Sequence, residues 1–164
     1  MPEYSFTVVI TGLDELSYEV VDELFEAGCD DATFGSRDGV CFGDFDREAE
    51  SAEVAIASAI RQVESVPPLS VHHVEPGEYV SLGLIAQRLG RTRESIRQLA
   101  VGLRGPGGFP VPVSGVTDRT RLWRWSEVAD WWERTFPAEL DPTVQELAQA
   151  VERFNARRCD KEPV

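Results

Sequence analysis

The sequence lacks the segments that would place a protein in a membrane or in an oxidising compartment. No apolar run approaches the roughly 20 residues that a membrane-spanning helix needs. The first residues, MPEYSF, show no basic stretch followed by an apolar core, so we expect no secretory signal. The three cysteines, Cys29, Cys41 and Cys159, are odd in number and widely spaced, and no CxxC pair occurs. These absences predict a cytoplasmic protein with reduced thiols and no membrane partner.

Motifs for catalysis and metal binding are absent too. No Ser/His/Asp set and no glycine-rich phosphate loop occurs. The only histidines, His72 and His73, are adjacent on a predicted strand, so we expect them to point to opposite faces and not to share a metal. Asp30 and Asp31 with residues 44–46 form an acidic cluster without a calcium-loop pattern, which we interpret as a solvated face or a surface for a basic partner. The sequence predicts no enzyme, no catalytic residue, no metal and no cofactor.

Positive charge is scarce as well: 16 Lys and Arg stand against 29 Asp and Glu, which gives a formal net charge of -13. Nucleic-acid binders usually show a basic face. The charge is unevenly spread, however. Residues 1–78 hold 18 Asp/Glu against three Arg, whereas residues 79–135 hold nine Arg against five acids. The acidity therefore belongs mainly to one half, and the second stretch is a candidate for nucleic-acid binding. Screening over about 8 Å at physiological salt lets a basic face act near an acidic domain.

Residues 1–76 predict a domain of alternating strands and helices in a chain of the α+β class. Runs of β-branched and aromatic residues predict the strands, and amphipathic periodicity predicts the helices. The expected elements are a strand over 4–12, a helix over 14–27, strands over 32–35 and 40–45, a helix over 48–66 and a strand over 69–74. Asp38-Gly39 favours a tight turn between the middle strands. This order predicts a ferredoxin-like βαββαβ domain, with two helices on one face of an antiparallel sheet.

In element order alone, residues 1–76 resemble ACT-type regulatory domains, which bind small molecules or pair through sheet edges. Such folds host many functions. Three roles therefore stay open for this acidic domain, namely dimerisation, contact with a protein partner, and sensing of a ligand.

The next stretch predicts two short helices around a glycine turn. Ser81 is the expected N-cap of a helix over 82–89, and Gly90 can take the left-handed conformation that ends it. Thr92 is the expected cap of a second helix, over 93–101. Its apolar residues share one face, and its polar residues, Arg93, Glu94, Arg97 and Gln98, share the other. The spacing is typical of a helix-turn-helix, and the alternative is an ordinary helical hairpin with solvated arginines.

The polar face of the second helix carries groups that can recognise DNA. Arginine can bind guanine through two hydrogen bonds, and glutamine can bind adenine in the same way. Thr92, Ser95 and the helix N-terminus can hold a phosphate. Glu94 on this face either accepts from cytosine N4 or repels phosphate.

A hairpin and a tryptophan-rich helix follow. Segments 111–114 and 120–125 are expected to pair, with Arg119 and Arg121 at the tip or on the returning strand. A basic hairpin beside a recognition helix is a wing, which suits phosphates or the minor groove. Ser126 is the expected cap of the next helix. Of the four tryptophans, we expect Trp123 and Trp131 in the core and Trp125 and Trp132 half exposed.

This stretch resembles the excisionase/MerR-like winged helix-turn-helix family, especially its small actinobacterial members. The resemblance covers residues 79–132 and is carried by the run IAQRLGRTR at 85–93, by Ile96 and Leu99, by FPVP at 109–112, and by Leu122, Trp123, Val128 and Trp131. It implies a DNA-binding domain over 79–135 that uses the helix at 92–99 and the hairpin. The implied DNA-binding residues are Arg91, Thr92, Arg93, Ser95, Arg97, Gln98, Arg119 and Arg121.

The C-terminal part predicts one amphipathic helix over 138–158. Asp141 is an expected N-cap, followed by Pro142 at the first helical position. The apolar stripe of this helix either packs on the same chain or forms a dimer contact. The last residues are expected to be a frayed tail.

The sequence as a whole predicts a sequence-specific, dimeric transcriptional regulator that binds double-stranded DNA, cytoplasmic and nucleoid-associated when bound. Useful affinity is expected to need two copies, because one small module neutralises few phosphates. Two alternatives stay open. One is a protein-interaction module, such as an antitoxin or anti-regulator, with a partner on the acidic domain. The other is a regulator that senses a ligand through that domain.

Overall fold

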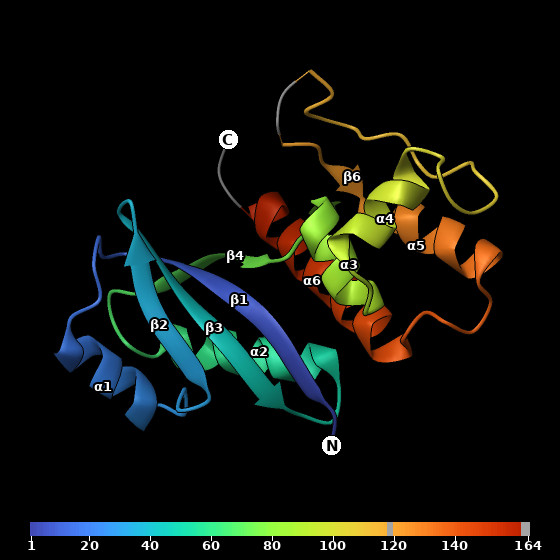
Figure 1. Cartoon of the computed structure of the whole chain (residues 1–164). Helices are drawn as coiled ribbons and strands as arrows, with labels where there is room; N and C mark the ends of the chain where they lie inside the picture. The colour runs from blue at the N-terminus through green and yellow to red at the C-terminus, as the bar shows by residue number, and fades with distance from the viewer. Residues whose placement is uncertain (118–119, 162–164) are drawn as a thin grey trace. The chain divides into compact units, whose positions relative to one another are not determined.

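A computed structural model describes residues 1–117 and 120–161, of which 159–161 are described by their backbone only. The chain has an α+β fold and divides into two compact units (Figure 1). We call Met1–Gly77 with Glu146–Val164 the sheet unit, and Glu78–Gln145 the inserted unit. No helix in the described part of the chain is long and apolar enough to cross a membrane.

The sheet unit contains a four-stranded antiparallel sheet in the order β2-β3-β1-β4. Its elements, in chain order, are β1 (Glu3–Thr11), α1 (Tyr18–Glu26), β2 (Ala32–Arg37), β3 (Val40–Glu48), α2 (Ala52–Glu64) and β4 (Ser70–Glu75). The predicted βαββαβ order is confirmed. Every second residue of β1, from Tyr4 to Ile10, is buried in one core with residues of α1 and α2. Both helices therefore cover the same face of the sheet.

Two helices of this unit begin later than the sequence predicts. The helix expected from residue 14 begins at Tyr18, because the Ser17 hydroxyl accepts a hydrogen bond from the Val20 amide at 3.3 Å. The helix expected from residue 48 begins at Ala52, because β3 continues to Glu48. Capping groups and strand pairing thus set these boundaries, and apolar periodicity does not. The predicted Asp38-Gly39 turn is confirmed, with φ of 53° and 79°.

The expectation that His72 and His73 point to opposite faces is wrong. Val9 of β1 pairs with His73, but Ile10 pairs with Val71, so His72 is an extra residue in a β-bulge. Val71 and Val74 are both buried, which places the two histidines between them on the outer side. Their Nδ1 atoms lie 2.8 Å apart, and His73 Nε2 lies 2.9 Å from a Glu75 carboxylate oxygen.

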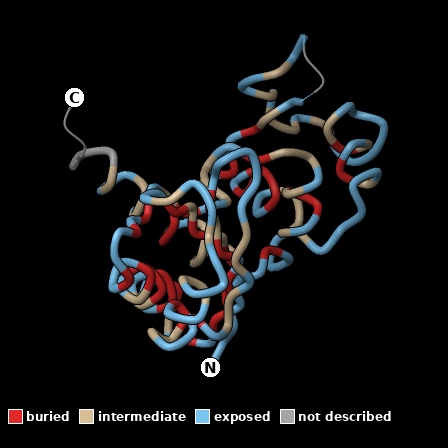
Figure 2. The backbone as a smooth tube through the Cα atoms, turned by 90° about the vertical axis from the view of Figure 1, so that its left-hand side faces the viewer, coloured by how far each residue is buried: buried red, intermediate tan, exposed pale blue. Residues whose placement is uncertain are grey.

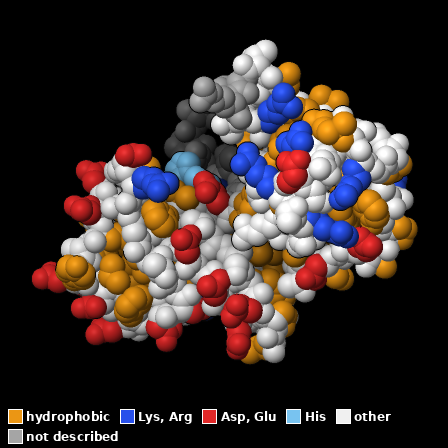
Figure 3. All heavy atoms as spheres, viewed as in Figure 1, with side chains coloured by type: hydrophobic (Ala, Val, Ile, Leu, Met, Phe, Trp, Pro, Cys, Tyr) orange, Lys and Arg blue, Asp and Glu red, His pale blue; other side chains and the backbone are white. Residues whose placement is uncertain are grey.

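The outer face of the sheet carries acidic side chains. Asp44, Asp46 and Glu48 alternate along β3 and are exposed. Figure 3 shows many Asp and Glu side chains, in red, on the surface of the chain. Thr7 donates a hydrogen bond to Asp44 at 2.6 Å, and Ser5 donates to Asp46 at 2.5 Å. Whether this face meets a basic partner stays a prediction.

One arginine is buried on the inner side of the sheet. Arg47 is 6% exposed, and its guanidinium forms two 2.8 Å hydrogen bonds with the Asp31 carboxylate. It also donates to the Ser58 hydroxyl and to the Gly28 carbonyl, each at 3.0 Å. The hydrogen bonding with Asp31 raises the pKa of Arg47, despite the opposing effect of burial. The charge is thus satisfied by groups from α2 and from the loop between α1 and β2.

The last helix, α6 (Pro142–Lys161), completes the core of the sheet unit. The predicted start is confirmed, because the Thr143 amide donates to the Asp141 carboxylate at 2.9 Å. Ala150 and Val151 are buried in the same core as the sheet. Of the two expected roles for the apolar stripe, the structure shows packing on the same chain.

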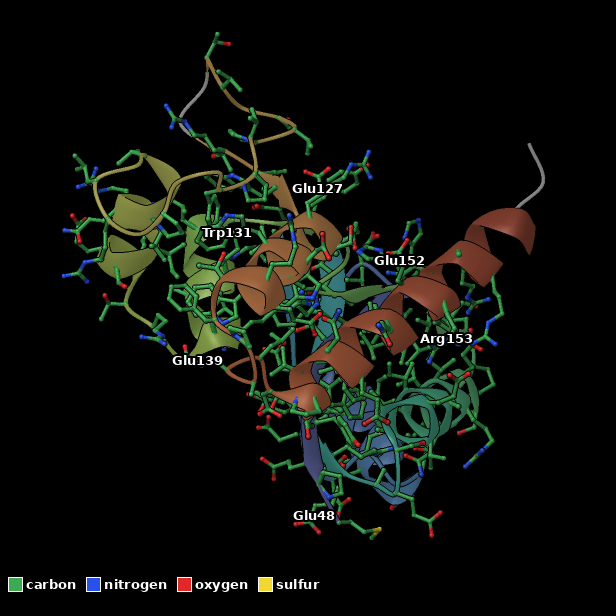
Figure 4. All side chains as sticks on the ribbon, turned by 90° about the vertical axis from the view of Figure 1, so that its right-hand side faces the viewer. Glu48, Glu127, Trp131, Glu139, Glu152 and Arg153 are labelled. Carbon is green, nitrogen blue, oxygen red and sulfur yellow. The ribbon has the colours of Figure 1, made fainter. Side chains whose placement is uncertain are left out.

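Polar side chains of α6 fix it to the sheet unit. The Glu146 carboxylate accepts from the Ala52 amide at the start of α2 and from the Tyr4 hydroxyl, at 2.9 and 3.0 Å. The Asn155 amide pairs with the backbone N–H and C=O of Val74, at 2.9 and 2.8 Å, along the edge strand β4. Arg153, labelled in Figure 4, forms an exposed ion pair with Glu53. Asn155 therefore satisfies part of an edge that would otherwise stay unpaired.

The inserted unit consists of helices and a two-stranded sheet. Its elements are β5 (Tyr79–Val80), α3 (Leu82–Leu89), α4 (Arg93–Ala100), β6 (Trp123–Arg124) and α5 (Trp125–Thr135). All four tryptophans are buried, at 1–5% exposure. Figure 2 colours the buried stretches of the chain red. The prediction is right for Trp123 and Trp131 but wrong for Trp125 and Trp132. Trp125 and Trp132 are both buried because the core of this small unit is built largely from aromatic side chains, each of which covers a large area.

Candidate functional site

Two short helices around Gly90 present the polar side chains of the inserted unit. α3 begins after Ser81, whose hydroxyl accepts from the Leu84 amide at 3.2 Å. α4 begins after Thr92, whose hydroxyl accepts from the Ser95 amide at 3.1 Å. Gly90 has φ of 65°, a left-handed conformation that ends α3. The two predicted caps and the glycine turn are confirmed, and α4 ends one residue before the predicted position.

The two sides of α4 differ sharply in burial. Ile96 and Leu99 are 0% and 5% exposed and pack inside the inserted unit. Arg93, Glu94 and Arg97 are exposed on the other side. All five residues thus match the predicted division into an apolar and a polar side. The helix can therefore stay anchored by one stripe while the other meets a ligand.

A groove of about 560 Å³ lies between α4 and the segment that leads back from the hairpin. Arg93 and Arg97 line it from α4, and Arg121 lines it from the returning segment. Its other lining residues are Ser81, Leu82, Val101, Thr120 and Trp123. Three predicted site residues from two separate motifs therefore surround one groove. Guanidinium groups are the donors best suited to phosphates and to the edge of guanine.

The hairpin that carries Arg121 is closed by two backbone hydrogen bonds. The Val113 amide donates to the Leu122 carbonyl at 2.8 Å, and the Leu122 amide donates to the Ser114 carbonyl at 3.0 Å. Gly115 has φ of 75°, and a Cβ there would overlap the Thr120 carbonyl. Only glycine fits at this position. The predicted pairing of 111–114 with 120–125 is confirmed around Leu122.

Beyond Leu122 the returning segment pairs with a strand that the sequence did not predict. β6 forms an antiparallel pair with β5, in which Tyr79 faces Arg124 and Val80 faces Trp123. The Arg124 guanidinium lies 5.3 Å from the Tyr79 ring centre. This pairing joins the start of α3 to the base of the hairpin, and so it fixes the two walls of the groove. A two-residue strand gives too short an alternation to be recognised from sequence.

Tryptophan side chains hold the loop before the hairpin. Trp123 Nε1 donates to the Pro110 carbonyl at 3.0 Å, and Trp131 Nε1 donates to the Gly107 carbonyl at 3.2 Å. Phe109 packs edge-on against both indoles, with ring centres 6.4 and 5.1 Å apart. Trp131 is labelled in Figure 4. The Phe-Pro segment is thus tied to the core of the unit just before the chain enters the hairpin.

Glu94 binds Arg97 on the exposed side of α4. The Arg97 Nε and Nη2 atoms lie 2.8 and 2.6 Å from the two carboxylate oxygens. The Gln98 amide also reaches this carboxylate, at 3.4 Å. The hydrogen bond between Glu94 and Arg97 raises the pKa of the arginine and lowers the pKa of the glutamate. Arg97 and Gln98, both predicted site residues, are therefore held by Glu94 in the free protein.

Two other predicted site residues are placed differently. Arg91 forms a 2.7 Å ion pair with Glu139, and its guanidinium lies 5.4 Å from the Trp132 ring centre. It does not line the groove. Arg119 lies outside the described residues. The structure thus brings Arg93, Arg97 and Arg121 together, with Thr92 and Ser95 at the start of the same helix.

The start of α5 also differs from the expectation. Ser126 is not the N-cap, because the helix begins at Trp125. The Glu78 carboxylate instead accepts a 2.9 Å hydrogen bond from the Ser126 amide and a second one from its hydroxyl. A side chain 48 positions earlier therefore caps this helix. Nothing in the local sequence around residue 126 could have revealed it.

The Arg88 side chain is turned inward from α3. Its guanidinium lies 4.7 Å from the Trp125 ring centre. Burial lowers the pKa of Arg88 to about 10, and nearby Glu78 opposes that effect. The arginine is still charged at neutral pH. It packs against Trp125 within the inserted unit and does not line the groove.

Comparison with known proteins gives no relative for this chain. No protein-family model, curated protein or solved structure matches it. Among the described residues, no group of three or more His, Cys, Asp or Glu side chains is placed to hold a metal ion. The functional argument therefore depends on the geometry of the arginine groove, by which we mean the groove lined by Arg93, Arg97 and Arg121.

Proposed function

We propose that the chain is a sequence-specific DNA-binding transcriptional regulator and that the inserted unit is a winged helix-turn-helix. In this proposal α4 enters the major groove as the recognition helix, and the hairpin that carries Arg121 is the wing. The sheet unit is a ferredoxin-like domain for assembly or control. The observation that carries the proposal is the arginine groove, because it combines guanidinium groups from both elements that would contact the duplex.

The charge distribution supports the same proposal. Residues 79–135 have nine Arg against five acids, whereas residues 1–78 have three Arg against 18 acids. Attraction to DNA phosphates depends on the charges near the contact, since salt screens charges beyond about 8 Å. The overall acidity therefore leaves binding through the inserted unit possible. The acidity of residues 1–78 also disfavours contact of DNA with the sheet unit. In this proposal the DNA contact is therefore confined to the inserted unit.

Three groove arginines in one copy can neutralise only a few phosphates. Because each phosphate contact contributes about −0.9 to the slope of log K against log salt, one copy gives a slope of about −3. Specific regulators usually gain affinity by placing two copies on half-sites about one helical turn apart. We therefore propose a homodimer on a two-fold symmetric operator.

The proposal is tested by fluorescence anisotropy with the purified protein and labelled duplexes from its own upstream region and of random sequence. We expect binding to both at low salt, with a preference for one native duplex and a steep loss of affinity as salt rises. The absence of any duplex binding at low salt would contradict the proposal. Binding of single strands as tightly as duplexes would also contradict it, because a recognition helix requires a major groove.

Replacing Glu94 with glutamine is expected to strengthen binding to random duplex about fivefold, since it removes a carboxylate from the DNA-facing side and frees Arg97. Anisotropy titrations at fixed salt measure the effect. The matched control is Glu127→Gln, which removes another exposed glutamate paired i,i+3 with an arginine, on α5. Equal gains from both variants would mean that only net charge matters. If Glu94 reads cytosine, the native-to-random preference also falls.

A further inference from the structure

A second groove lies within the sheet unit, between α2 and α6. Its volume is about 610 Å³. Ala57 and Ile60 from α2 and Phe154 from α6 provide apolar surface, and the guanidinium groups are those of Arg61, Arg157 and Arg158. The Glu64 carboxylate and Ser65 complete the lining. Small-molecule sites commonly have volumes of about 300–1,000 Å³, with apolar walls and a few polar groups that orient the ligand. This groove has both components.

Three arginines at one place are unexpected in this unit. The sheet unit as a whole has six Arg and one Lys against 21 Asp/Glu, and one of the arginines, Arg47, is buried in its pair with Asp31. Within this unit α6 supplies Arg157 and Arg158 to the groove and α2 supplies Arg61. Three positive charges thus line the groove against the single carboxylate of Glu64, so the groove favours an anion.

The ion pairs around the groove leave some N–H donors of these arginines without a carboxylate partner. Arg158 lies 2.6 Å from Glu64, but its Nε atom is buried and has no hydrogen-bond partner among the described residues. The Arg157 guanidinium lies 3.3 Å from the Glu53 carboxylate, a long contact, and the same carboxylate also pairs with Arg153. Arg61 forms no ion pair within the described part of the chain. Arg61, and in part Arg157, thus keep N–H donors that no carboxylate binds among the described residues, next to the apolar surface of the groove.

We propose that this groove binds a small organic anion that has an apolar body and one carboxylate. The carboxylate is held by Arg61 and Arg157, and the apolar body lies on Ile60 and Phe154. A carboxylate suits a pair of guanidinium groups through parallel N–H donors. The apolar floor favours an alkyl or aryl acid over inorganic phosphate, which has no surface to bury there.

A ligand in this position would contact α2 and α6 together. Because it binds only when the two helices are packed, it stabilises the folded sheet unit by mass action. The site is independent of the proposed DNA contact, since the arginine groove belongs to the other unit. Failure of either proposal therefore leaves the other unaffected, provided that ligand binding is measured without DNA.

The test uses the full chain with three probes, octanoate, octan-1-ol and inorganic phosphate, followed by calorimetry and by amide chemical shifts. We expect saturable binding of octanoate, with shifts concentrated in α2 and α6, and binding of the alcohol and of phosphate at least about tenfold weaker. Equal affinity for octanoate and octan-1-ol would overturn the proposal, because the guanidinium groups would then contribute nothing. If phosphate bound as tightly as octanoate, the proposed contact of the apolar body with Ile60 and Phe154 would be wrong. Octanoate binding that does not saturate would overturn the whole proposal.

Single substitutions locate the site. Arg61→Gln and Arg157→Gln are each expected to weaken octanoate binding about tenfold, because each removes a charged hydrogen bond. Arg153→Gln is the matched control, since Arg153 shares Glu53 with Arg157 but does not line the groove. We expect it to change affinity less than about twofold. All three positions are at the surface, so melting curves check that each variant is folded. Equal losses from Arg153→Gln and Arg157→Gln would overturn the assignment.

Discussion

Replacing Asp31 with alanine is expected to destabilise the protein by about 2–3 kcal/mol. Asp31 is the only carboxylate that contacts the buried Arg47 guanidinium among the described residues, through two 2.8 Å hydrogen bonds. Without it the charge of Arg47 stays buried beside only the Ser58 hydroxyl and the Gly28 carbonyl. We expect a smaller loss of unfolding free energy than for a fully buried ion pair, because the Asp31 side chain is 30% exposed. Urea unfolding measures the change.

The neighbouring residue gives a control for this prediction. Asp30 is exposed and has the same charge, so Asp30→Ala removes one negative charge without leaving Arg47 unpaired. We expect it to change the free energy of unfolding by less than about 0.5 kcal/mol. Similar losses from the two variants would show that the effect comes from net charge, and the buried pair would then not be a stability determinant.

The second large effect is expected in the arginine groove. Arg93→Ala and Arg121→Ala should each weaken binding to duplex DNA about tenfold, and the double variant about a hundredfold, since the two residues lie on different elements around the groove. If each contacts a phosphate, each single variant also lowers the salt slope by about 1. Anisotropy titrations over a range of salt concentrations measure both quantities.

Arg97 and a control arginine refine this test. Arg97→Ala is expected to reduce the preference for the native duplex more than the salt slope, if it reads a base edge from α4. Arg134→Ala is the control, because Arg134 is exposed on α5, pairs with Asp130 and does not line the groove. A loss of affinity from Arg134→Ala equal to that from Arg93→Ala would place the DNA contact elsewhere on the inserted unit.

Local chemistry in the sequence predicted much of the fold. Asp38-Gly39 specified its turn, and Ser81, Gly90 and Thr92 specified the ends of α3 and α4. These signals act over three or four residues, so a single sequence contains them in full. Two of the helices of the sheet unit began later than periodicity indicated, because a nearby cap or a continuing strand decides where a helix can start.

Features that depend on distant residues were missed. The pairing of β5 with β6, and the capping of α5 by Glu78, join positions more than 40 residues apart. The bulge at His72 depends on how β4 pairs with β1, which one strand does not reveal. The burial of Trp125 and Trp132 likewise depends on what packs around them.

The candidate site was predicted in part. Arg93, Arg97 and Arg121 meet at one groove, although the sequence showed only that they lie on two basic elements. Arg91 is held by Glu139, a residue that follows α5, and no local pattern indicates this pair. The contact between Glu94 and Arg97 could have been inferred, since residues three apart lie on the same side of a helix.

The position of α6 has a consequence for how the chain folds during synthesis. Glu78–Gln145 is one continuous stretch, so the inserted unit can be complete while later residues are still being added. The sheet unit needs Ala150 and Val151 for its core and Glu146 to cap α2, so its strands must wait for the far end of the chain. Once residue 145 has emerged from the ribosome, the nascent chain therefore has a complete inserted unit, whereas the core of the sheet unit still lacks α6.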